Sequence, residues 1–160
     1  MNITGTKWSG RMMKLAHEVA SWSKDTSTKV GAVITTEDGA PMSWGFNGMP
    51  MGIDDQVEER NVRPTKYKWY CHAERNAMDL APGSVEGGVM FVTFSPCSSC
   101  AQSIIQRKIK TVVVDANHTA DKMPERWQED MIVAVEMLNE AGVEMLAAYP
   151  SRLLDDDDML

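Results

Sequence analysis

The sequence has few cysteines, no long apolar run and no excess of basic residues. No apolar run approaches the roughly 18 residues that a membrane-spanning helix needs, so we exclude a transmembrane protein and a membrane partner. Residues 1–14 contain no apolar segment typical of a secretory signal, and we expect none. The three cysteines, two of them in one Cys-x-x-Cys, cannot all pair within one chain. This pattern favours a reducing compartment and predicts the cytoplasm.

Acidic residues outnumber basic ones, with 23 aspartates and glutamates against 16 lysines and arginines, for a net charge of −7. Binding along a polynucleotide needs a basic face, because the affinity comes largely from neutralising phosphates. We therefore expect no polynucleotide partner. A small nucleotide is still compatible with the composition, since one phosphate needs only a few local donors.

No repeat, linker or change in composition divides the chain, which predicts one domain over residues 1–150 and an acidic C-terminal tail over 151–160. An antiparallel hairpin followed by alternating strands and helices predicts an α/β protein with a mixed sheet and helices on both faces. Periodicity and turn residues predict a helix over about 9–23 with Ser9 as its N-cap, strands 30–36, 41–46 and 89–95, a helix opening at Pro96, strand 111–115, a helix over about 123–141 with Pro124 near its first position, and strand 143–149.

Residues 47–71 form a long connection without clear periodicity, and they include Gly48, Pro50, Gly52 and Pro64. Loops of this length are uncommon in compact domains unless they have a function. We therefore expect this connection to have a functional role.

Two short segments carry the chemistry: His72-Ala73-Glu74 and Pro96-Cys97-Ser98-Ser99-Cys100. Two thiolates and one imidazole form a zinc-binding set, and three protein ligands leave the fourth position open for water. A structural zinc site would need a fourth protein ligand, for which the sequence offers Cys71, His17 and His118. Cys71 directly precedes His72, and adjacent residues rarely point at one metal.

Glu74 separates a catalytic site from a structural one. Zinc lowers the pKa of a bound water to about 7, and a nearby carboxylate can take its proton and pass it to a leaving group. A Cys-x-x-Cys alone is equally compatible with a redox pair or two buried thiols. Both of those interpretations leave His72 and Glu74 unexplained, so the two segments together favour a catalytic zinc.

The two segments match the zinc deaminase signature, and the chain resembles the zinc-dependent cytidine/deoxycytidylate deaminase family, especially its deoxycytidylate (dCMP) deaminase branch. The resemblance covers about residues 9–149. The matching segments are Ser23-Lys24-Asp25, Val30-Gly31-Ala32-Val33-Ile34, Gly45-Phe46-Asn47-Gly48-Met49-Pro50, Cys71-His72-Ala73-Glu74-Arg75-Asn76-Ala77, Pro96-Cys97-Ser98-Ser99-Cys100-Ala101 and Ile109-Lys110.

This resemblance implies a three-layer α/β/α cytidine-deaminase-like fold with a mixed five-stranded sheet. It implies hydrolytic deamination of dCMP to dUMP and ammonia, which supplies dUMP for thymidylate synthesis. By analogy, His72, Cys97 and Cys100 hold one catalytic Zn2+, and Glu74 is the catalytic proton shuttle. The family also implies a homohexamer that dCTP activates and dTTP inhibits, with Mg2+ bound to the regulatory triphosphate.

Two alternatives to the function stay open: a deaminase of another base or of tRNA, and a zinc-binding module without catalysis.

Further site residues follow from the same resemblance. His118 stands where relatives have a tyrosine near the substrate, and Lys24 is our first candidate for the 5′-phosphate. The full set of expected substrate contacts is Asn47, Lys24, Ala73, Ser95 and His118, and the expected regulatory nucleotide contacts are Gly45, Phe46, Gly48, Met49 and Pro50.

Overall fold

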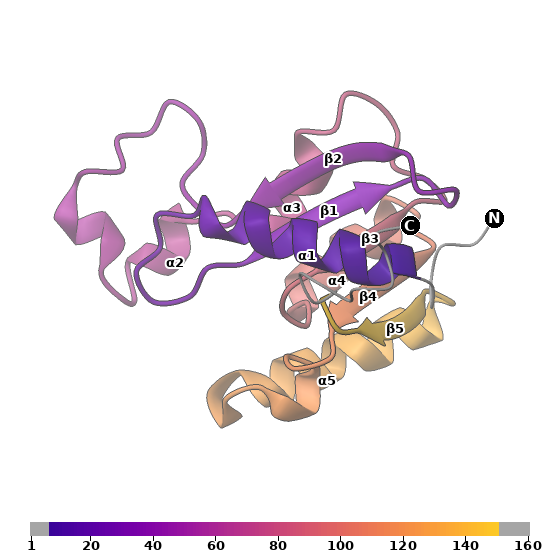
Figure 1. Cartoon of the computed structure of the whole chain (residues 1–160). Helices are drawn as coiled ribbons and strands as arrows, with labels where there is room; N and C mark the ends of the chain where they lie inside the picture. The colour runs from indigo at the N-terminus through magenta and orange to yellow at the C-terminus, as the bar shows by residue number, and fades with distance from the viewer. Residues whose placement is uncertain (1–6, 151–160) are drawn as a thin grey trace, which may run out of the picture.

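The computed structural model describes residues 7–150, so the predicted acidic tail over 151–160 lies outside the described residues. The chain begins with a helix and a hairpin and continues with alternating helices and strands (Figure 1). The elements are α1 (Lys7–Ser21), β1 (Gly31–Thr35), β2 (Pro41–Phe46), the 3-10 helix η1 (Glu58–Asn61), α2 (Lys66–Trp69), α3 (Ala73–Asp79), β3 (Val89–Val92), α4 (Ser98–Gln106), β4 (Thr111–Asp115), the 3-10 helix η2 (Ala120–Lys122), α5 (Glu125–Glu140) and β5 (Glu144–Ala148).

The five strands form one mixed sheet in the order β2-β1-β3-β4-β5. Strand β1 is antiparallel to both β2 and β3, whereas β3, β4 and β5 run parallel to one another. The prediction of an antiparallel hairpin joined to a parallel half-sheet is therefore confirmed. Strands β1, β3 and β4 are buried along their whole length, as is typical of strands covered on both faces.

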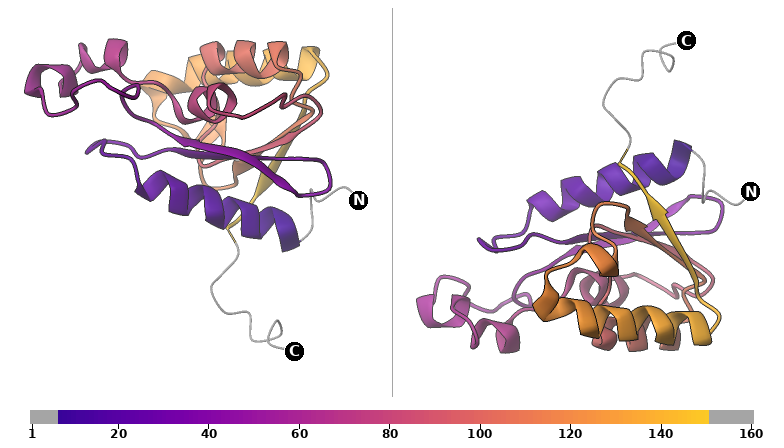
Figure 2. Two further views of the ribbon diagram at one scale, coloured as in Figure 1. Left: turned by 90° about the horizontal axis from the view of Figure 1, so that it is seen from above. Right: turned by 90° about the horizontal axis from the view of Figure 1, so that it is seen from below.

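Helices cover both faces of the sheet and give three layers (Figure 2). Helix α1 lies alone on one face, where its Met13 packs with Val33 and Phe91 from the sheet. Helices α3, α4 and α5 lie on the other face, where the alternate strand residues Ile34 and Met90 are buried. None of the described helices is long and apolar enough to span a membrane.

Gly45 determines how closely α3 approaches the sheet. A Cβ at this position would lie 2.3 Å from the backbone nitrogen of Ala77 and 2.6 Å from the carbonyl oxygen of Ala73. Because both atoms belong to the backbone of α3, only glycine allows β2 and α3 to pack at this distance. The segment that begins with His72 is thereby held against the end of the sheet.

Three details of the predicted elements are wrong. Ser9 is not an N-cap, because α1 already includes Lys7 and Ser9 is buried within the helix. Strand β3 ends at Val92 rather than at residue 95, since the backbone nitrogen of Ser95 donates to the carbonyl of His118 instead of a sheet neighbour. Pro124 is the N-cap of α5, with an extended ψ of 139°, and not its first helical residue.

Candidate metal centre and active-site cavity

The three predicted metal ligands come together at the N-termini of two helices. His72 is the N-cap of α3, Cys97 is the N-cap of α4, and Cys100 lies in the first turn of α4. The Nδ1 atom of His72 lies 3.4 Å from the Sγ of Cys97 and 3.5 Å from the Sγ of Cys100. A tetrahedral zinc with ordinary Zn–N and Zn–S bond lengths requires N···S separations of about 3.5 Å, so the side chains fit this ion.

The charges of these groups also suit a metal site. A hydrogen bond from Cys100 and another from His72 lower the pKa of Cys97 to about 4, against the effect of burial. The hydrogen bond to Cys97 raises the pKa of His72 to about 9. The same pairing with Cys97, together with burial, raises the pKa of Cys100. A metal that binds here must displace the protons of His72 and Cys100.

No fourth side chain joins this cluster within residues 7–150. Cys71 is adjacent in sequence, but its backbone is bridged to Gly48, with its nitrogen 2.7 Å from the Gly48 carbonyl oxygen. His17 hydrogen-bonds Asp115 on the other face of the sheet. A set of three ligands with one open position is typical of a catalytic rather than a structural zinc.

Glu74 lies in the first turn of α3 and lines the same cavity as His72 and Cys97. The residue is only 4% exposed. Burial raises the pKa of the Glu74 carboxyl to about 7, although the charge of His72 opposes this shift. The sequence therefore places a buried carboxylate beside the metal-binding side chains, where it can accept or donate a proton.

The cavity in front of these groups has a volume of about 320 Å³. This volume lies at the lower end of the range for small-molecule sites. Four aromatic residues form much of its wall: Tyr67, Tyr70, Phe94 and Trp127. Such a wall can hold a planar base by stacking and exclude water from the reacting atoms.

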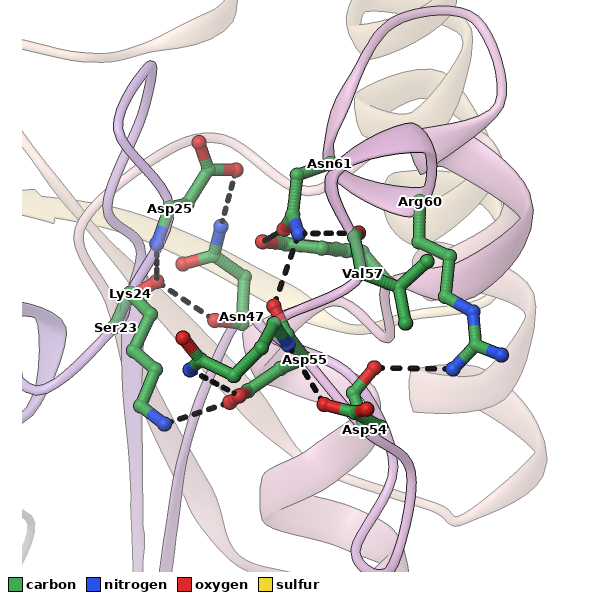
Figure 3. A network of polar contacts seen from close by, with 11 residues as sticks. Ser23, Lys24, Asp25, Asn47, Asp54, Asp55, Val57, Arg60 and Asn61 are labelled. Atoms are coloured by element: carbon green, nitrogen blue, oxygen red, sulfur yellow. Dashed lines mark hydrogen bonds and ion pairs between the residues drawn. The ribbon is translucent and has the colours of Figure 1, made fainter.

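Asn47 lines the cavity, and its side-chain amide is bonded within the chain. Its Oδ1 accepts a hydrogen bond of 2.8 Å from the backbone of Val30, and its Nδ2 donates to the Thr28 carbonyl and to Asp25. Figure 3 shows how Asn47 lies beside Ser23 and Asp25, with the Ser23 hydroxyl donating to the Asn47 carbonyl. Asn47 therefore ties the segment that precedes β1 to the end of β2 at the cavity wall.

Lys24 does not line the cavity. Its ammonium group lies 2.7 Å from the carboxylate of Asp55 and its side chain is 71% exposed. In Figure 3, this ion pair joins the segment that follows α1 to the 47–71 connection, where Asn61 donates to the carbonyls of Asp55 and Val57. Lys24, the first candidate for the 5′-phosphate contact, is therefore paired with Asp55 outside the cavity. The next residue, Asp25, lines the cavity instead.

The other predicted substrate contacts divide into two groups. Ala73 and Ser95 line the cavity, but His118 does not. The His118 ring is stacked on Phe94, with centroids 4.4 Å apart and an interplanar angle of 21°, and its carbonyl accepts from Ser95. His118 therefore supports the cavity wall from behind through Phe94 and Ser95.

None of the five predicted regulatory residues lines the cavity. Gly45 is in β2 against α3, and Phe46 makes an edge-to-face contact with Trp22 at 6.2 Å. A Cβ at Gly48 would meet nothing within 4 Å. Met49 and Pro50 follow Gly48, whose backbone is bridged to Cys71, directly before His72. The regulatory role of these five residues stays a prediction.

Several charged residues of the cavity wall were not predicted. Lys66 is buried, and its ammonium group lies 2.8 and 2.7 Å from the two carboxylate oxygens of Asp25. Arg63 also lines the cavity, and so does Asp130, which accepts hydrogen bonds from the backbone and hydroxyl of Ser98. The unusual length of the 47–71 connection indicated a functional role for its residues, but no local pattern pointed to Asp130 in α5.

The chain is similar in sequence and structure to known deaminases. The family model for the cytidine and deoxycytidylate deaminase zinc-binding region matches residues 6–116. The chain is 42% identical over 140 residues to an uncharacterized deaminase in the luxG 3′ region of Aliivibrio fischeri, covering 88% of this chain and 92% of that protein. It is 34% identical over 164 residues to the deoxycytidylate deaminase of Homo sapiens, covering 96% of this chain and 88% of that protein.

A solved structure gives the same result in three dimensions. The dCMP deaminase of cyanophage S-TIM5, in complex with dCMP and dUMP, is 27% identical with a TM-score of 0.66, covering 85% of this chain and 93% of that chain. The family match spans both metal-binding segments, and the fold has the predicted mixed five-stranded sheet between helices. The chain therefore belongs to the cytidine and deoxycytidylate deaminase family.

Proposed function

We propose that the protein hydrolyses dCMP to dUMP and ammonia at the cavity that contains His72, Cys97 and Cys100. The observation that carries this proposal is the buried carboxylate of Glu74 beside three side chains with zinc-binding geometry. The substrate is taken from the relatives, since the human relative is named a deoxycytidylate deaminase and the cyanophage enzyme was solved with dCMP and dUMP.

Zinc held by His72, Cys97 and Cys100 would lower the pKa of a water molecule to about 7 and so supply hydroxide for attack at C4 of the cytosine. Glu74 would accept the proton of this water and deliver it to N3 of the base, which leaves C4 tetrahedral with a hydroxyl and the amino group. Glu74 would then take the proton of the C4 hydroxyl and pass it to the 4-amino group, so that the C–N bond breaks, ammonia leaves and the C4 carbonyl of dUMP forms. Burial of Glu74 keeps these transfers out of bulk solvent.

The cavity wall orients the base for this reaction. Ala73 and Ser95 lie beside the metal-binding segments, and Asn47 lies on the same wall. Phe94, backed by the ring of His118, offers a planar surface on which a pyrimidine can stack. We therefore assign these residues to substrate binding, with His118 acting through Phe94.

A direct assay tests the activity. Zinc-loaded protein is incubated with dCMP, deoxycytidine, guanine and a tRNA, and ammonia release is measured for each. We expect dCMP to be the preferred substrate. Preferential reaction of guanine or of tRNA would instead identify the protein as a deaminase of another base or of tRNA. Zinc binding without ammonia release from any substrate would select the non-catalytic module.

Regulation is the second part of the proposal. By family analogy, dCTP activates and dTTP inhibits a cytoplasmic homohexamer, with Mg2+ on the triphosphate, and the dUMP formed serves thymidylate synthesis. The support in this chain is the segment Gly45–Pro50, whose residues lie outside the catalytic cavity except for Asn47. An effector acts by its difference in affinity between two states, typically by 5- to 150-fold.

Equilibrium binding distinguishes regulation from competition. A separate regulatory site lets dTTP and a dCMP analogue occupy the same subunit. If a saturating analogue displaces all bound dTTP, the two ligands compete for the catalytic cavity and the regulatory site is rejected. Sedimentation of the same samples measures the number of subunits.

A further inference from the structure

The cavity contains one positive side chain whose charge is not used inside the protein. Asp25 is paired with Lys66, and Asp130 accepts hydrogen bonds from Ser98. Arg63 lines the same cavity, but within the described residues its guanidinium makes no ion pair and contacts only aromatic rings.

Two aromatic rings hold Arg63 at the exposed side of the cavity. Its Cζ atom lies 5.8 Å from the ring centroid of Tyr67, in the same connection, and 5.8 Å from that of Trp127, in α5. These cation–π contacts restrict the guanidinium without consuming its N–H donors. Arg63 therefore joins the 47–71 connection to α5 and still has donors for a ligand.

The net charge of the whole protein favours a local cation for an anionic substrate. The net charge is −7, so the general field opposes the approach of a phosphate dianion. Lys66, which also lines the cavity, is only 6% exposed and already neutralised by Asp25. A guanidinium can bind phosphate oxygens through two parallel N–H···O bonds, which a lysine cannot do.

From this geometry we propose that Arg63 recognises the 5′-phosphate of the nucleotide and sets the preference for a nucleoside monophosphate over a nucleoside. This inference rests on the proposed function, which places the base at His72 and Glu74. The phosphate then lies toward the exposed side of the cavity, where Arg63 is held between Tyr67 and Trp127. Lys24, our first candidate from sequence, contacts Asp55 instead.

Binding of the product dUMP and of deoxyuridine tests this role, because these two ligands differ only by the phosphate. Calorimetry on the zinc-loaded protein is expected to show tighter binding of dUMP. The variant Arg63→Gln is expected to weaken dUMP binding by about 10- to 100-fold, the range for hydrogen bonds to charged groups, and to leave deoxyuridine binding unchanged. The affinity of Arg63→Lys for dUMP is expected to lie between that of the unmodified protein and that of Arg63→Gln.

Arg126 provides a matched control, since its Cζ lies 4.4 Å from the Trp127 ring centroid but it does not line the cavity. Arg126→Gln is expected to retain the preference for dUMP. If Arg63→Gln weakens both ligands equally or neither, the proposed role of Arg63 is overturned. Ammonia release from dCMP by the unmodified protein is measured in parallel, and its absence would reject the proposed function instead.

Discussion

In the proposed reaction Glu74 moves the protons, because it combines burial with a position beside three metal-binding side chains. The variant Glu74→Gln keeps the shape of the side chain and removes its ability to accept a proton. We expect it to retain zinc and fold while losing turnover by ~10²–10⁴-fold or more. Ammonia release from dCMP and metal analysis of the same sample test this prediction, and near-normal turnover would reject Glu74 as the proton shuttle.

Asp25, a residue of the cavity wall, makes the stability of the folded protein depend on pH. Burial alone would raise the pKa of Asp25, but hydrogen bonds from Lys66 and from the backbone of Ser27 and Thr28 outweigh this effect and lower it. A lowered pKa in the folded state stabilises the protein above the unfolded value of about 3.9, and this stabilisation is lost as the pH falls through the folded pKa.

We therefore expect Asp25→Asn to reduce the free energy of unfolding most at neutral pH, because it leaves Lys66 buried without a counter-ion. The difference from the unmodified protein should shrink below about pH 4, since protonation of Asp25 has the same effect. Urea unfolding at several pH values measures the loss of unfolding free energy at neutral pH and its decrease at low pH. Glu86→Gln, which removes an exposed pair with Lys108, serves as the control with little change. A difference that is constant with pH would contradict this account.

At the scale of elements, residues 41–46 and 111–115 could be predicted with their observed bounds because turn residues or charged residues flank short β-branched or aromatic runs. Local patterns also indicated the three metal-binding side chains, because they belong to two short segments, His72-Ala73-Glu74 and Pro96–Cys100. In the structure each of the three lies at the start of a helix. The cavity wall could not be predicted in the same way. Trp127 and Asp130 belong to α5 and line the cavity, where Trp127 contacts Arg63 of the 47–71 connection. These segments meet only in the folded chain, and no spacing in the sequence records that contact.

Gly45 shows how a strand can position a site from outside the cavity. The family resemblance places this glycine in a regulatory loop, and that role stays a prediction. The structure shows that Gly45 allows α3 to lie against β2. We expect Gly45→Ala to lower the free energy of unfolding by about 1–3 kcal/mol or more, because the added methyl group meets helix backbone rather than a movable side chain. Urea unfolding and zinc content measure the effect on the fold and on the segment that begins with His72.

Gly48 provides the matched control for this substitution. It lies in the same predicted segment, and a Cβ there would meet nothing within 4 Å. Gly48→Ala should therefore unfold at nearly the same urea concentration as the unmodified protein. Equal destabilisation by both alanines would show that the close packing on α3 is not the reason for glycine at position 45.

At the scale of the whole molecule, the metal ligands connect two units that follow different strands. Helix α3 packs on β2, the edge strand, whereas α4 follows β3 in the middle of the sheet. Zinc bound by His72, Cys97 and Cys100 would hold the starts of both helices together. Binding to the folded state alone stabilises a protein by about 4 kcal/mol when the free ligand is 1,000 times its dissociation constant.

Zinc removal should therefore lower the free energy of unfolding of the entire domain, and not only its activity. We expect one zinc per chain, and a chelator should shift the urea midpoint of the unmodified protein downward. Cys100→Ser should begin at this lower midpoint and respond little to the chelator, because one ligand is already lost. Cys71→Ser should behave like the unmodified protein, since the Cys71 backbone is bridged to Gly48 and its thiol lies outside the ligand cluster. An equal response of Cys100→Ser and the unmodified protein would show that the metal binds elsewhere.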